Sequence, residues 1–482
     1  MQTLTNYVDG HLSPPRQDRY LDVIEPATGM VFARCPDSDA DDVDAAVAAA
    51  RRAFPAWAAT APEERARLLE EIAARIAARV SEFAEAESRD SGKPVALARQ
   101  LDIPRAIANL RFFAAAITQF SSEAHAMGDG AINYTLHRPL GAVACISPWN
   151  LPLYLFTWKI APALAAGNTV VAKPSEVTPY TAWMFAQVCG EAGLPPGVLN
   201  IVHGSGARSG QALVEHDGIA AVSFTGSTRT GAAIAAAAAP KFKKLSLEMG
   251  GKNPTLVFAD WNASEANWQT LLRSAFANQG QICLCGSRIL VERSIYDAFA
   301  REFVERARAL RVGDPQDAAS DLGAIVSREH FDKVMGHITL AREEGGTILC
   351  GGEAVRMDGR CAGGRFIAPT VIAGLGPHCR TNQEEIFGPV ATLLPFEGED
   401  EAVELANATK YGLAASVWTT HLGRAHRVAA RLESGIVWIN CWLKRDLRTP
   451  FGGVKNSGVG REGGWYALRF FTEPKNICVP LD

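Results

Sequence analysis

One cysteine of this chain lies where an apolar pattern is interrupted by polar residues. Cys283 follows the segment Asn278–Gln281, and residues 271–276 before that segment are mostly apolar and predict the end of a helix. The apolar pattern resumes at Ile289–Val291, which predicts a strand. A thiol at such a break could lie in a cleft and act as a nucleophile. The alternative is a small buried apolar residue, the usual role of a free cysteine, and this stretch alone does not choose between them.

Two further polar residues stand just past predicted strands. Asn150 follows the predicted strand Gly141–Ile146, and its side-chain amide could donate to a developing oxyanion. Glu248 follows the strand-like segment Lys244–Leu247 and precedes Met-Gly-Gly, where a carboxylate could act as a base on water or on a thiol. Each residue has an ordinary alternative, because such an asparagine is commonly a turn residue and a lone glutamate is commonly ion-paired at the surface.

Two glycine-rich turns also follow predicted strands, at residues 203–210 and 224–231, and each opens a predicted helix. Free backbone N–H groups and the helix dipole at such a turn favour a phosphate or pyrophosphate. Neither turn has the spacing G-x-G-x-x-G, so each also fits a simple strand-to-helix turn. Lys173 and Glu176 follow another strand, where the carboxylate could bind both hydroxyls of an adenosine ribose or simply be an exposed charge.

The elements that must position these residues alternate along the chain. The predicted strands of the first series are Gly141–Ile146, Thr169–Ala172, Val198–Val202, Ala220–Phe224 and Thr255–Phe258. The predicted helices between them cover about 157–166, 180–192, 207–216 and 228–239. A second series over about 259–445 has predicted helices near 264–278, 295–310, 328–344, 400–408 and 423–432. This alternation predicts an α/β fold with largely parallel sheets and helices on both faces.

The N-terminal part is expected to hold short strands over residues 1–36 and three helices. The first helix is predicted over 39–58, and the third over about 96–120. The second is expected to begin with a capping box formed by Thr60 and Glu63 and to run towards Ser88. Residues 131–145 predict a strand, a turn and a second strand.

Length and composition limit the class of protein. A chain of 482 residues is too long for one compact core, and 48% hydrophobic with 21% charged residues is an ordinary globular balance. A net charge of −4 argues against a nucleic-acid or membrane-surface binder, and no apolar run approaches the roughly 20 residues that span a bilayer. The ten cysteines lack the paired spacing of a zinc site, so no metal is expected. Without a signal peptide, the expected location is cytoplasmic, with reduced thiols.

Six motifs that occur in a fixed order make the functional interpretation of these residues more specific than any one residue does alone. They are Ser147-Pro-Trp-Asn150, Phe224-Thr-Gly-Ser227, Leu247-Glu-Met-Gly-Gly-Lys-Asn-Pro254, the Asn278–Cys283 segment, Glu384-Glu-Ile-Phe-Gly-Pro389 and Pro450-Phe-Gly-Gly453. With them the sequence resembles the NAD(P)-dependent aldehyde dehydrogenase superfamily over nearly its whole length. The resemblance implies that Cys283 forms a thiohemiacetal and then a thioester, that Asn150 and the Cys283 N–H stabilise the oxyanion, and that Glu248 activates the hydrolytic water.

The resemblance also implies NAD as the cofactor and a set of residues that bind it. Lys173 and Glu176 would hold the adenosine ribose, Ser227 would contact the pyrophosphate, and Glu385 would hold the nicotinamide ribose with Phe387 nearby. The full expected set is Ile146, Trp149, Lys173, Glu176, Gly206, Gly210, Phe224, Gly226, Ser227, Glu385 and Phe387. Glu176 favours NAD over NADP, because its charge would repel a 2′-phosphate.

Four stretches support a narrower resemblance, to the aminomuconate and hydroxymuconate semialdehyde dehydrogenases. They are Asp102–Phe113, Ser147–Tyr154, Asn278–Cys285 and Asn440–Phe451. In that group two arginines bind the carboxylate end of the substrate, and Arg105 and Arg445 match those positions. A guanidinium pair suits a carboxylate because its planar fork binds both oxygens. Lys444 departs from the apolar residue expected there, Arg111 is expected at the surface, and Arg448 and Cys285 have no assigned role.

Taken together, the sequence predicts NAD-dependent oxidation of 2-aminomuconate 6-semialdehyde or 2-hydroxymuconate semialdehyde, two small aldehydes between which the sequence does not choose. The expected fold is a doubly wound NAD-binding domain (1–120 and 141–247), an α/β catalytic domain (248–446) and an oligomerisation arm (121–140 and 465–482) of a homodimer or homotetramer. The alternatives are oxidation of betaine aldehyde or an aliphatic aldehyde, and a catalytically silent protein on the same scaffold. The arginine pair would repel a cationic aldehyde.

Overall fold

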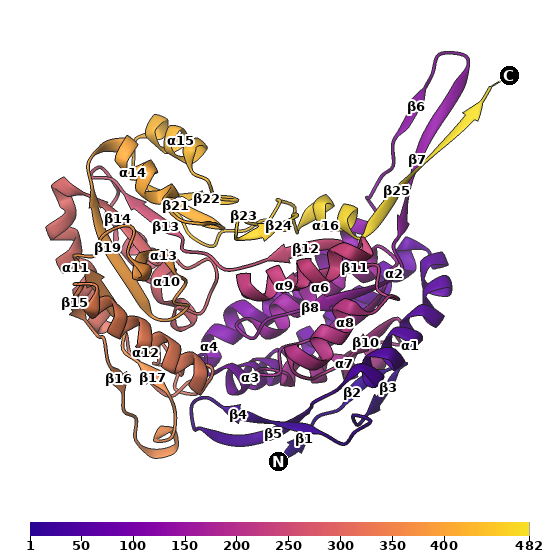
Figure 1. Cartoon of the computed structure of the whole chain (residues 1–482), viewed down its shortest axis with the longest axis horizontal. Coiled ribbons are helices and arrows are strands. Elements are labelled where there is room, and N and C mark those ends of the chain that lie inside the picture. Colours follow the sequence, from indigo (N-terminus) through magenta and orange to yellow (C-terminus); the bar gives the residue numbers. More distant parts are fainter. Residues whose placement is uncertain (482) are drawn as a thin grey trace.

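The computed structural model describes residues 1–481, and two large sheets organise it (Figure 1). The first has eight strands in the order β24-β12-β11-β8-β9-β10-β2-β3. Its strands are β2 (Asn6–Val8), β3 (His11–Ser13), β8 (Ala142–Ile146), β9 (Thr169–Lys173), β10 (Leu199–Ile201), β11 (Ala221–Thr225), β12 (Lys244–Glu248) and β24 (Gly458–Val459). The five central strands, β12 to β10, are parallel. From β8 the chain adds β9 and β10 on one side and then β11 and β12 on the other, so the strand order reverses between β8 and β11.

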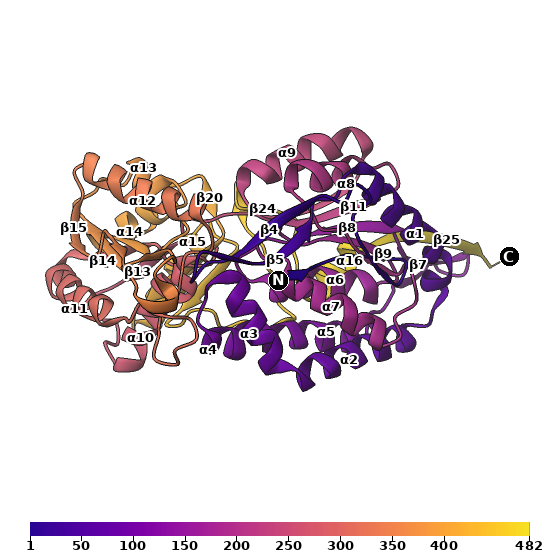
Figure 2. The same cartoon turned by 90° about the horizontal axis from the view of Figure 1, so that it is seen from below.

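Alternating side chains of this sheet pack against two helical layers. Ala142, Ala144 and Ile146 of β8 face α1 (Ala40–Ala59), α8 (Gln211–Glu215) and α9 (Thr228–Ala238), whereas Val143 and Cys145 face the opposite layer. That layer contains α2 (Pro62–Ala78), α3 (Val80–Ser91), α5 (Ile103–Ile117), α6 (Pro152–Ala165) and α7 (Tyr180–Glu191). Figure 2 shows α8 and α9 on one face and α2 and α5 on the other. Burial on both faces explains why these strands read as continuous apolar runs.

The second sheet has seven strands in the order β15-β18-β19-β14-β13-β21-β22. They are β13 (Pro254–Val257), β14 (Arg288–Glu292), β15 (Thr347–Cys350), β18 (Thr370–Ala373), β19 (Val390–Phe396), β21 (Ala414–Trp418) and β22 (Ile436–Ile439). Only the β15–β18 pair is antiparallel. The flanking helices are α10 (Glu265–Phe276), α11 (Tyr296–Ala309), α12 (Arg328–Glu343), α14 (Gly398–Asn407) and α15 (Leu422–Arg431). The predicted α/β class is confirmed. The strand predicted at Thr255–Phe258 as part of the first series is instead β13 of this second sheet, because it pairs with β14 and β21.

A third, three-stranded antiparallel sheet projects from the body of the molecule (Figure 1). It consists of β6 (Ala124–Ala126), β7 (Ala131–Pro139) and β25 (Thr472–Pro480), and the short helix α16 (Gly464–Phe470) leads into it. The three strands fall within the predicted arm, 121–140 and 465–482, whereas α16 begins one residue before its second segment. Asp482 lies outside the described residues. Among residues 1–481, no helix combines the length and apolar character that a membrane crossing requires.

The structure corrects the predicted start of the second helix. The expected capping box at Thr60 and Glu63 is absent, because α2 begins at Pro62 with Ala61 as its N-cap and no side-chain cap. The Thr60 hydroxyl instead donates to the carbonyl of Ala56 (3.0 Å) at the end of α1.

The predicted second and third helices are also divided. Arg79 (φ −121°) separates α2 from α3. The third helix begins as α4 (Val95–Leu97), widens into the π-helical turn η1 (Ala98–Asp102) and continues as α5. Pro104 has no N–H and its ring would clash with the carbonyl four residues earlier, which accounts for a wider turn at this place.

Candidate active site

Cys283 is reached through an unusual turn. After α10, Asn278 and Gln279 adopt left-handed backbone angles (φ 53° and 56°), which are uncommon outside glycine and concentrate at functional sites. The Asn253 side chain, just before β13, donates to the carbonyls of Cys283 (2.7 Å) and Cys285 (2.9 Å). The cysteine is therefore held between the end of α10 and the start of β14, with its side chain half-buried.

A cavity of about 210 Å³ brings seven of the predicted residues together: Trp149, Asn150, Gly226, Ser227, Cys283, Glu385 and Phe387. Trp149 and Asn150 follow β8, and Gly226 and Ser227 follow β11. These are the two strands at which the order of the first sheet reverses, the usual ligand position in an open α/β sheet. The cavity is also lined by Met249, Gly250, His330 and Lys333, to which no role was assigned from the sequence.

The side-chain amide of Asn150 has one N–H group that is not used in a hydrogen bond within residues 1–481. The side-chain amide nitrogen donates to the main-chain carbonyl of Gln281 (2.9 Å), and the main-chain carbonyl of Asn150 accepts from Lys93 (2.9 Å) and Asn278 (3.0 Å). An asparagine amide has two N–H groups, and one remains after the bond to Gln281. Because Asn150 and Cys283 line the same cavity, that group could donate to an oxygen on a carbon bound to the thiol.

Glu248, the last residue of β12, is almost fully buried. Neither of its carboxylate oxygens has a hydrogen-bond partner within residues 1–481. Burial raises its pKa well above the usual range, and the neighbouring Glu462 carboxylate raises it further. A Cβ atom on Gly452 would lie 2.7 Å from Glu248 Oε1, so the Pro450–Gly453 segment leaves room for this side chain only with glycine at that position. Glu248 does not line the 210 Å³ cavity, but its negative charge raises the pKa of the Cys283 thiol.

The environment of Cys283 favours the protonated thiol. Burial raises the pKa of Cys283 well above its ordinary value, and the carboxylates of Glu385 and Glu248 raise it further. The positive charge of Arg445 acts in the opposite direction and lowers the pKa of both Cys283 and Glu248.

Four predicted cofactor residues meet beside the strands β9 and β10. Glu176 forms an ion pair with Lys173 (3.0 Å), and the Gly206 N–H donates to its other oxygen (3.3 Å). Burial raises the pKa of Glu176, but Lys173 and backbone N–H groups outweigh that effect and the net pKa is lowered. Gly210 lies against the Lys173 stem, where a Cβ would be 3.6 Å from its Cδ. Glu176 is thus an ionised carboxylate at the edge of the sheet, as a ribose site requires.

The turn after β11 fits the start of a helix. Ser227 is the N-cap of α9, and its hydroxyl accepts from the Thr230 N–H (3.1 Å). A Cβ on Gly226 would lie only 2.4 Å from the Phe224 ring, so a glycine is required over that ring. Phe224 and Ile146 themselves pack in the core beneath this turn and do not line the cavity with Cys283.

The opposite wall is formed by Glu385, Phe387 and His330. The Gly251 N–H donates to Glu385 (2.9 Å). Phe387 has a left-handed backbone (φ 63°), and its carbonyl accepts from His330 Nε2 (2.6 Å). Burial lowers the pKa of His330 to about 4, so the ring is neutral near pH 7. The Trp149, His330 and Phe387 rings pack together, with centroids 4.9 to 5.9 Å apart.

The two predicted substrate arginines line a second cavity, of about 890 Å³. Arg445 donates to the Tyr154 hydroxyl (2.6 Å) and its guanidinium lies over the rings of Phe451 (4.0 Å) and Trp158 (4.9 Å). Arg105 contacts the same tyrosine, with its guanidinium 5.7 Å from the Tyr154 ring centroid. Both guanidinium groups therefore contact Tyr154, a shared contact that the sequence did not reveal.

Other cations near this cavity differ in their pairing. Arg448 is held by Asp446 (2.5 Å), which neutralises its charge locally, whereas Lys444 lines the cavity and is exposed. Arg111 is exposed and paired with Glu70 (2.9 Å), as expected of a surface residue.

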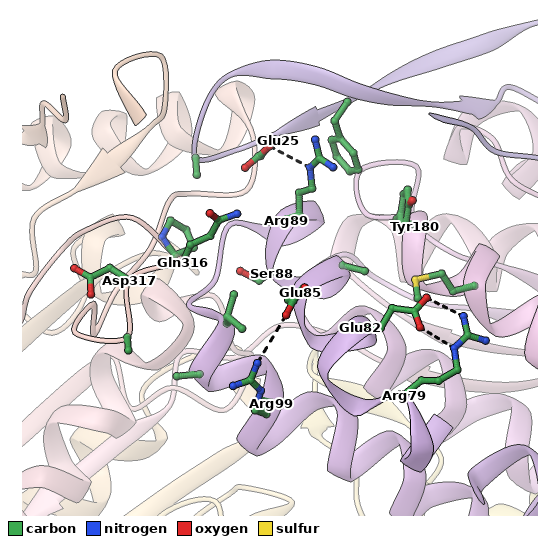
Figure 3. Close-up of a pocket in the computed structure, with 18 of the residues that line it drawn as sticks. Glu25, Arg79, Glu82, Glu85, Ser88, Arg89, Arg99, Tyr180, Gln316 and Asp317 are labelled. Carbon is green, nitrogen blue, oxygen red and sulfur yellow. Dashed lines mark hydrogen bonds and ion pairs between the residues drawn. The ribbon is translucent and has the colours of Figure 1, made fainter. Parts of the chain in front are cut away.

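A further cavity of about 890 Å³ lies away from Cys283, between α3, α7 and the loop around Pro315 (Figure 3). Its arginines are paired with neighbouring carboxylates, Arg79 with Glu82 (2.8 Å) and Arg89 with Glu25 (3.2 Å). It contains no cysteine, so the chemistry is assigned to the smaller cavity at the strand ends. Among residues 1–481, no three His, Cys, Asp or Glu side chains gather as metal ligands.

The chain is similar to known proteins over nearly its whole length. The profile of the aldehyde dehydrogenase family matches residues 13–477. The 2-aminomuconic semialdehyde dehydrogenase of Homo sapiens is 50% identical over 99% of this chain and 98% of its own, and the 2-hydroxymuconic semialdehyde dehydrogenase of Pseudomonas sp. (strain CF600) is 47% identical over the full length of both. The crystal structure of PnpE in complex with nicotinamide adenine dinucleotide has a TM-score of 0.97 at 41% identity, covering 100% of this chain and 98% of that one.

Proposed function

The chain belongs to the aldehyde dehydrogenase family and is therefore an oxidoreductase, and from this premise we propose that it oxidises a carboxylate-bearing unsaturated semialdehyde to the dicarboxylate with NAD. The observation that carries the substrate class is the pair of guanidinium groups, Arg105 and Arg445, which both line the second cavity, of about 890 Å³, and both contact Tyr154. The relatives named for 2-aminomuconic and 2-hydroxymuconic semialdehydes support this class, and both semialdehydes are candidates.

The proposed reaction starts at the Cys283 sulfur. The thiol first loses its proton to solvent. The thiolate then adds to the aldehyde carbon, and the oxygen becomes an oxyanion that the free Asn150 N–H and the Cys283 N–H stabilise. When bound, NAD supplies the acceptor for the hydride that leaves this carbon. The carbon then remains attached to sulfur as a thioester.

Hydrolysis of that thioester needs a base, and Glu248 is proposed for it. Water must lose a proton as it attacks, and a carboxylate whose pKa is raised by burial accepts that proton more readily than an ordinary glutamate. The Lys159–Glu462 ion pair (2.7 Å) lies beside it, and its members act oppositely on the Glu248 pKa. The products are the carboxylate and the free Cys283 thiol.

The cofactor proposal rests on three features that match NAD. Glu176 presents an ionised carboxylate, the turn at Gly226 and Ser227 opens α9 with its free N–H groups, and Glu385 lines the cavity that also holds Cys283. A 2′-phosphate would meet the charge of Glu176, so NAD is favoured over NADP.

The arginines also weigh against other aldehydes. A cationic aldehyde such as betaine aldehyde would be repelled by both guanidinium groups, and an aliphatic aldehyde would leave them without a partner.

The cytoplasm remains the proposed location, since all ten cysteines are free thiols, as in a reducing compartment.

The experiment that tests the substrate class compares two substrates in two variants. Arg105→Met and Arg445→Met should each lose about 10- to 150-fold in kcat/KM with a muconate semialdehyde, because a charge-assisted hydrogen bond contributes about 1.5–3 kcal/mol. With an uncharged aldehyde of similar length the loss should be small. The double variant should lose less than the product of the single losses, because both residues hold one group.

Arg111→Met is the matched control, since Arg111 is exposed and paired only with Glu70. It should keep the efficiency of the unchanged protein with both substrates. Full efficiency of both single variants on the carboxylated aldehyde would reject the arginine pair and the substrate class with it.

A further inference from the structure

A lysine is buried directly behind the proposed oxyanion donor. The α3 helix ends at Gly92, whose left-handed backbone (φ 78°) turns the chain so that Lys93 points into the protein. The Lys93 side chain is fully buried, pairs with the equally buried Asp102 of η1 and donates to the main-chain carbonyl of Asn150 (2.9 Å). A buried ammonium is strongly unfavourable unless it is paired and hydrogen-bonded, so these contacts define its position.

A second donor reaches the same carbonyl from the cysteine loop. The Asn278 amide donates to the Asn150 carbonyl (3.0 Å) and to the Gln281 carbonyl (3.2 Å), to which the Asn150 amide also donates (2.9 Å). These bonds form a closed set that joins Asn150 to the residue two before Cys283. The left-handed backbone of Asn278 places its side chain within this set.

The end of the β8–α6 turn is held from α3, the helix that precedes Lys93. Glu87, a fully buried residue of α3, accepts from the Leu153 N–H (3.1 Å) and from the Thr181 hydroxyl (2.6 Å). Lys93 and Glu87 thus hold the β8–α6 turn at two points, the carbonyl of Asn150 and the N–H of Leu153. Neither lines a cavity with Cys283, so both act only through the turn.

We propose that Lys93, fixed by Asp102, is a positioning residue that sets the orientation of the Asn150 amide towards the oxyanion. The inference rests on the proposed role of Asn150. Without the ammonium, the peptide group that precedes Leu151 keeps one donor, Asn278, and can rotate about it. Such a rotation carries the side chain of Asn150 with it, and a donor displaced by about 1 Å loses most of its effect on the transition state.

The test is a double-mutant cycle on the first turnover. Lys93→Met, which keeps the length and removes the charge, should lower the rate of first-turnover NADH formation by about 10- to 100-fold. In an Asn150→Ala background the same substitution should change that rate by less than about threefold, because its target is already absent. Alkylation of Cys283 by iodoacetamide forms no oxyanion, so its rate and the NAD dissociation constant should stay within about twofold.

Arg65→Met is the matched control, because Arg65 is another buried cation that donates to a main-chain carbonyl of α6, that of Ala165 (2.9 Å), at the opposite end of the helix. It should lower the melting temperature without the loss in first-turnover rate. If Lys93→Met does not fold, Asn278→Ala, which removes the other donor to the Asn150 carbonyl, should show the same pattern.

The outcomes separate the two proposals. An unchanged first-turnover rate in Lys93→Met, or an equal loss in the Asn150→Ala background, would overturn the role of Lys93 alone. An unchanged rate in Asn150→Ala would overturn the oxyanion role of Asn150, and the inference on Lys93 would fall with it.

Discussion

Burial acts in the same direction on the two residues proposed to carry the chemistry. It raises the pKa of the Cys283 thiol and of the Glu248 carboxyl, and nearby carboxylates add to both shifts. Each group is therefore protonated over a wider pH range than in water. For the thiol this lowers the fraction of the reactive thiolate, whereas for the carboxylate it produces a stronger base once the proton is lost.

The first prediction concerns the thiol. A raised pKa leaves little thiolate near neutral pH, so the alkylation rate of Cys283 by iodoacetamide in the cofactor-free protein should rise with pH through about 8.5, the ordinary thiol value, without a plateau. Peptide mass spectrometry measures modification at this cysteine, and Cys283→Ser is the control that removes the signal. A plateau reached below pH of about 7 would contradict the raised pKa.

The second prediction concerns the base. Glu248→Gln should keep the first burst of NADH but lower the steady-state rate by about 10²- to 10⁴-fold, because thioester hydrolysis loses its general base. Intact-protein mass should show an acyl group on Cys283. In the unchanged protein, hydrolysis should accelerate as pH rises, since the ionised form of a carboxyl with a raised pKa appears only at higher pH. Normal turnover of the variant with no adduct would remove Glu248 from this role.

At the scale of elements, the site is made by turns at strand ends. The turn after β8 carries Asn150 and the turn after β11 carries Ser227. The two turns are adjacent because β8 and β11 are neighbouring parallel strands, in which Val143 pairs with Ala221 and Ile146 with Phe224. The turn after β9 carries Glu176, which the turn after β10 holds through the Gly206 N–H. Parallel strands place all four turns along one edge of the sheet.

The third prediction follows from this edge. The unchanged protein should be more efficient with NAD than with NADP, and Glu176→Gln should narrow that preference by at least about fivefold, the effect of about 1 kcal/mol of charge repulsion. Glu191→Gln, at the far end of α7, is the control and should leave the preference unchanged. Steady-state kinetics with both cofactors decide this, and equal efficiency of the unchanged protein with NAD and NADP would count against Glu176.

The whole molecule presents a surface that a single chain leaves uncovered. The projecting sheet of β6, β7 and β25 exposes apolar side chains, among them Ile132 and Val479, which are directly paired across β7 and β25. Exposed apolar groups on a projecting sheet with free edges are typical of subunit contacts. We therefore propose that this arm joins copies of the chain into a homodimer or homotetramer.

The fourth prediction tests the arm. Light scattering should give a mass of two or four chains, against 51.6 kDa for one. The double variant Ile132→Lys, Val479→Lys should have a measured mass closer to that of one chain, because two positive charges replace the exposed apolar pair. Asn476→Lys is the control, since its side chain lies on the other face of β25. A monomer in the unchanged protein would reject the arm as a subunit contact.

Much of the fold could be predicted from the sequence, because its signals are local. Strands buried on both faces read as short apolar runs, as in Thr169–Ala172, and helices between them repeat with a helical period, so the α/β alternation was visible residue by residue. Two local predictions differed from the structure, and each difference has a local cause. The Thr60 hydroxyl donates to the carbonyl of Ala56 instead of capping the second helix, and the third helix contains a π-helical turn just before Pro104. The division into domains and the roles of the site residues remain proposals that these elements support.

The sequence by itself determined which residue types are present at which strand ends, and with them the family. Only the tertiary structure decided which of these residues meet. Strand order places the turn after β8 beside the turn after β11, and Lys93 reaches Asn150 across 57 positions. Tyr154 contacts both Arg105 and Arg445, which are 340 positions apart by their numbers, 105 and 445. Such contacts depend on long-range packing, and no local pattern of hydrophobicity or turn residues encodes them.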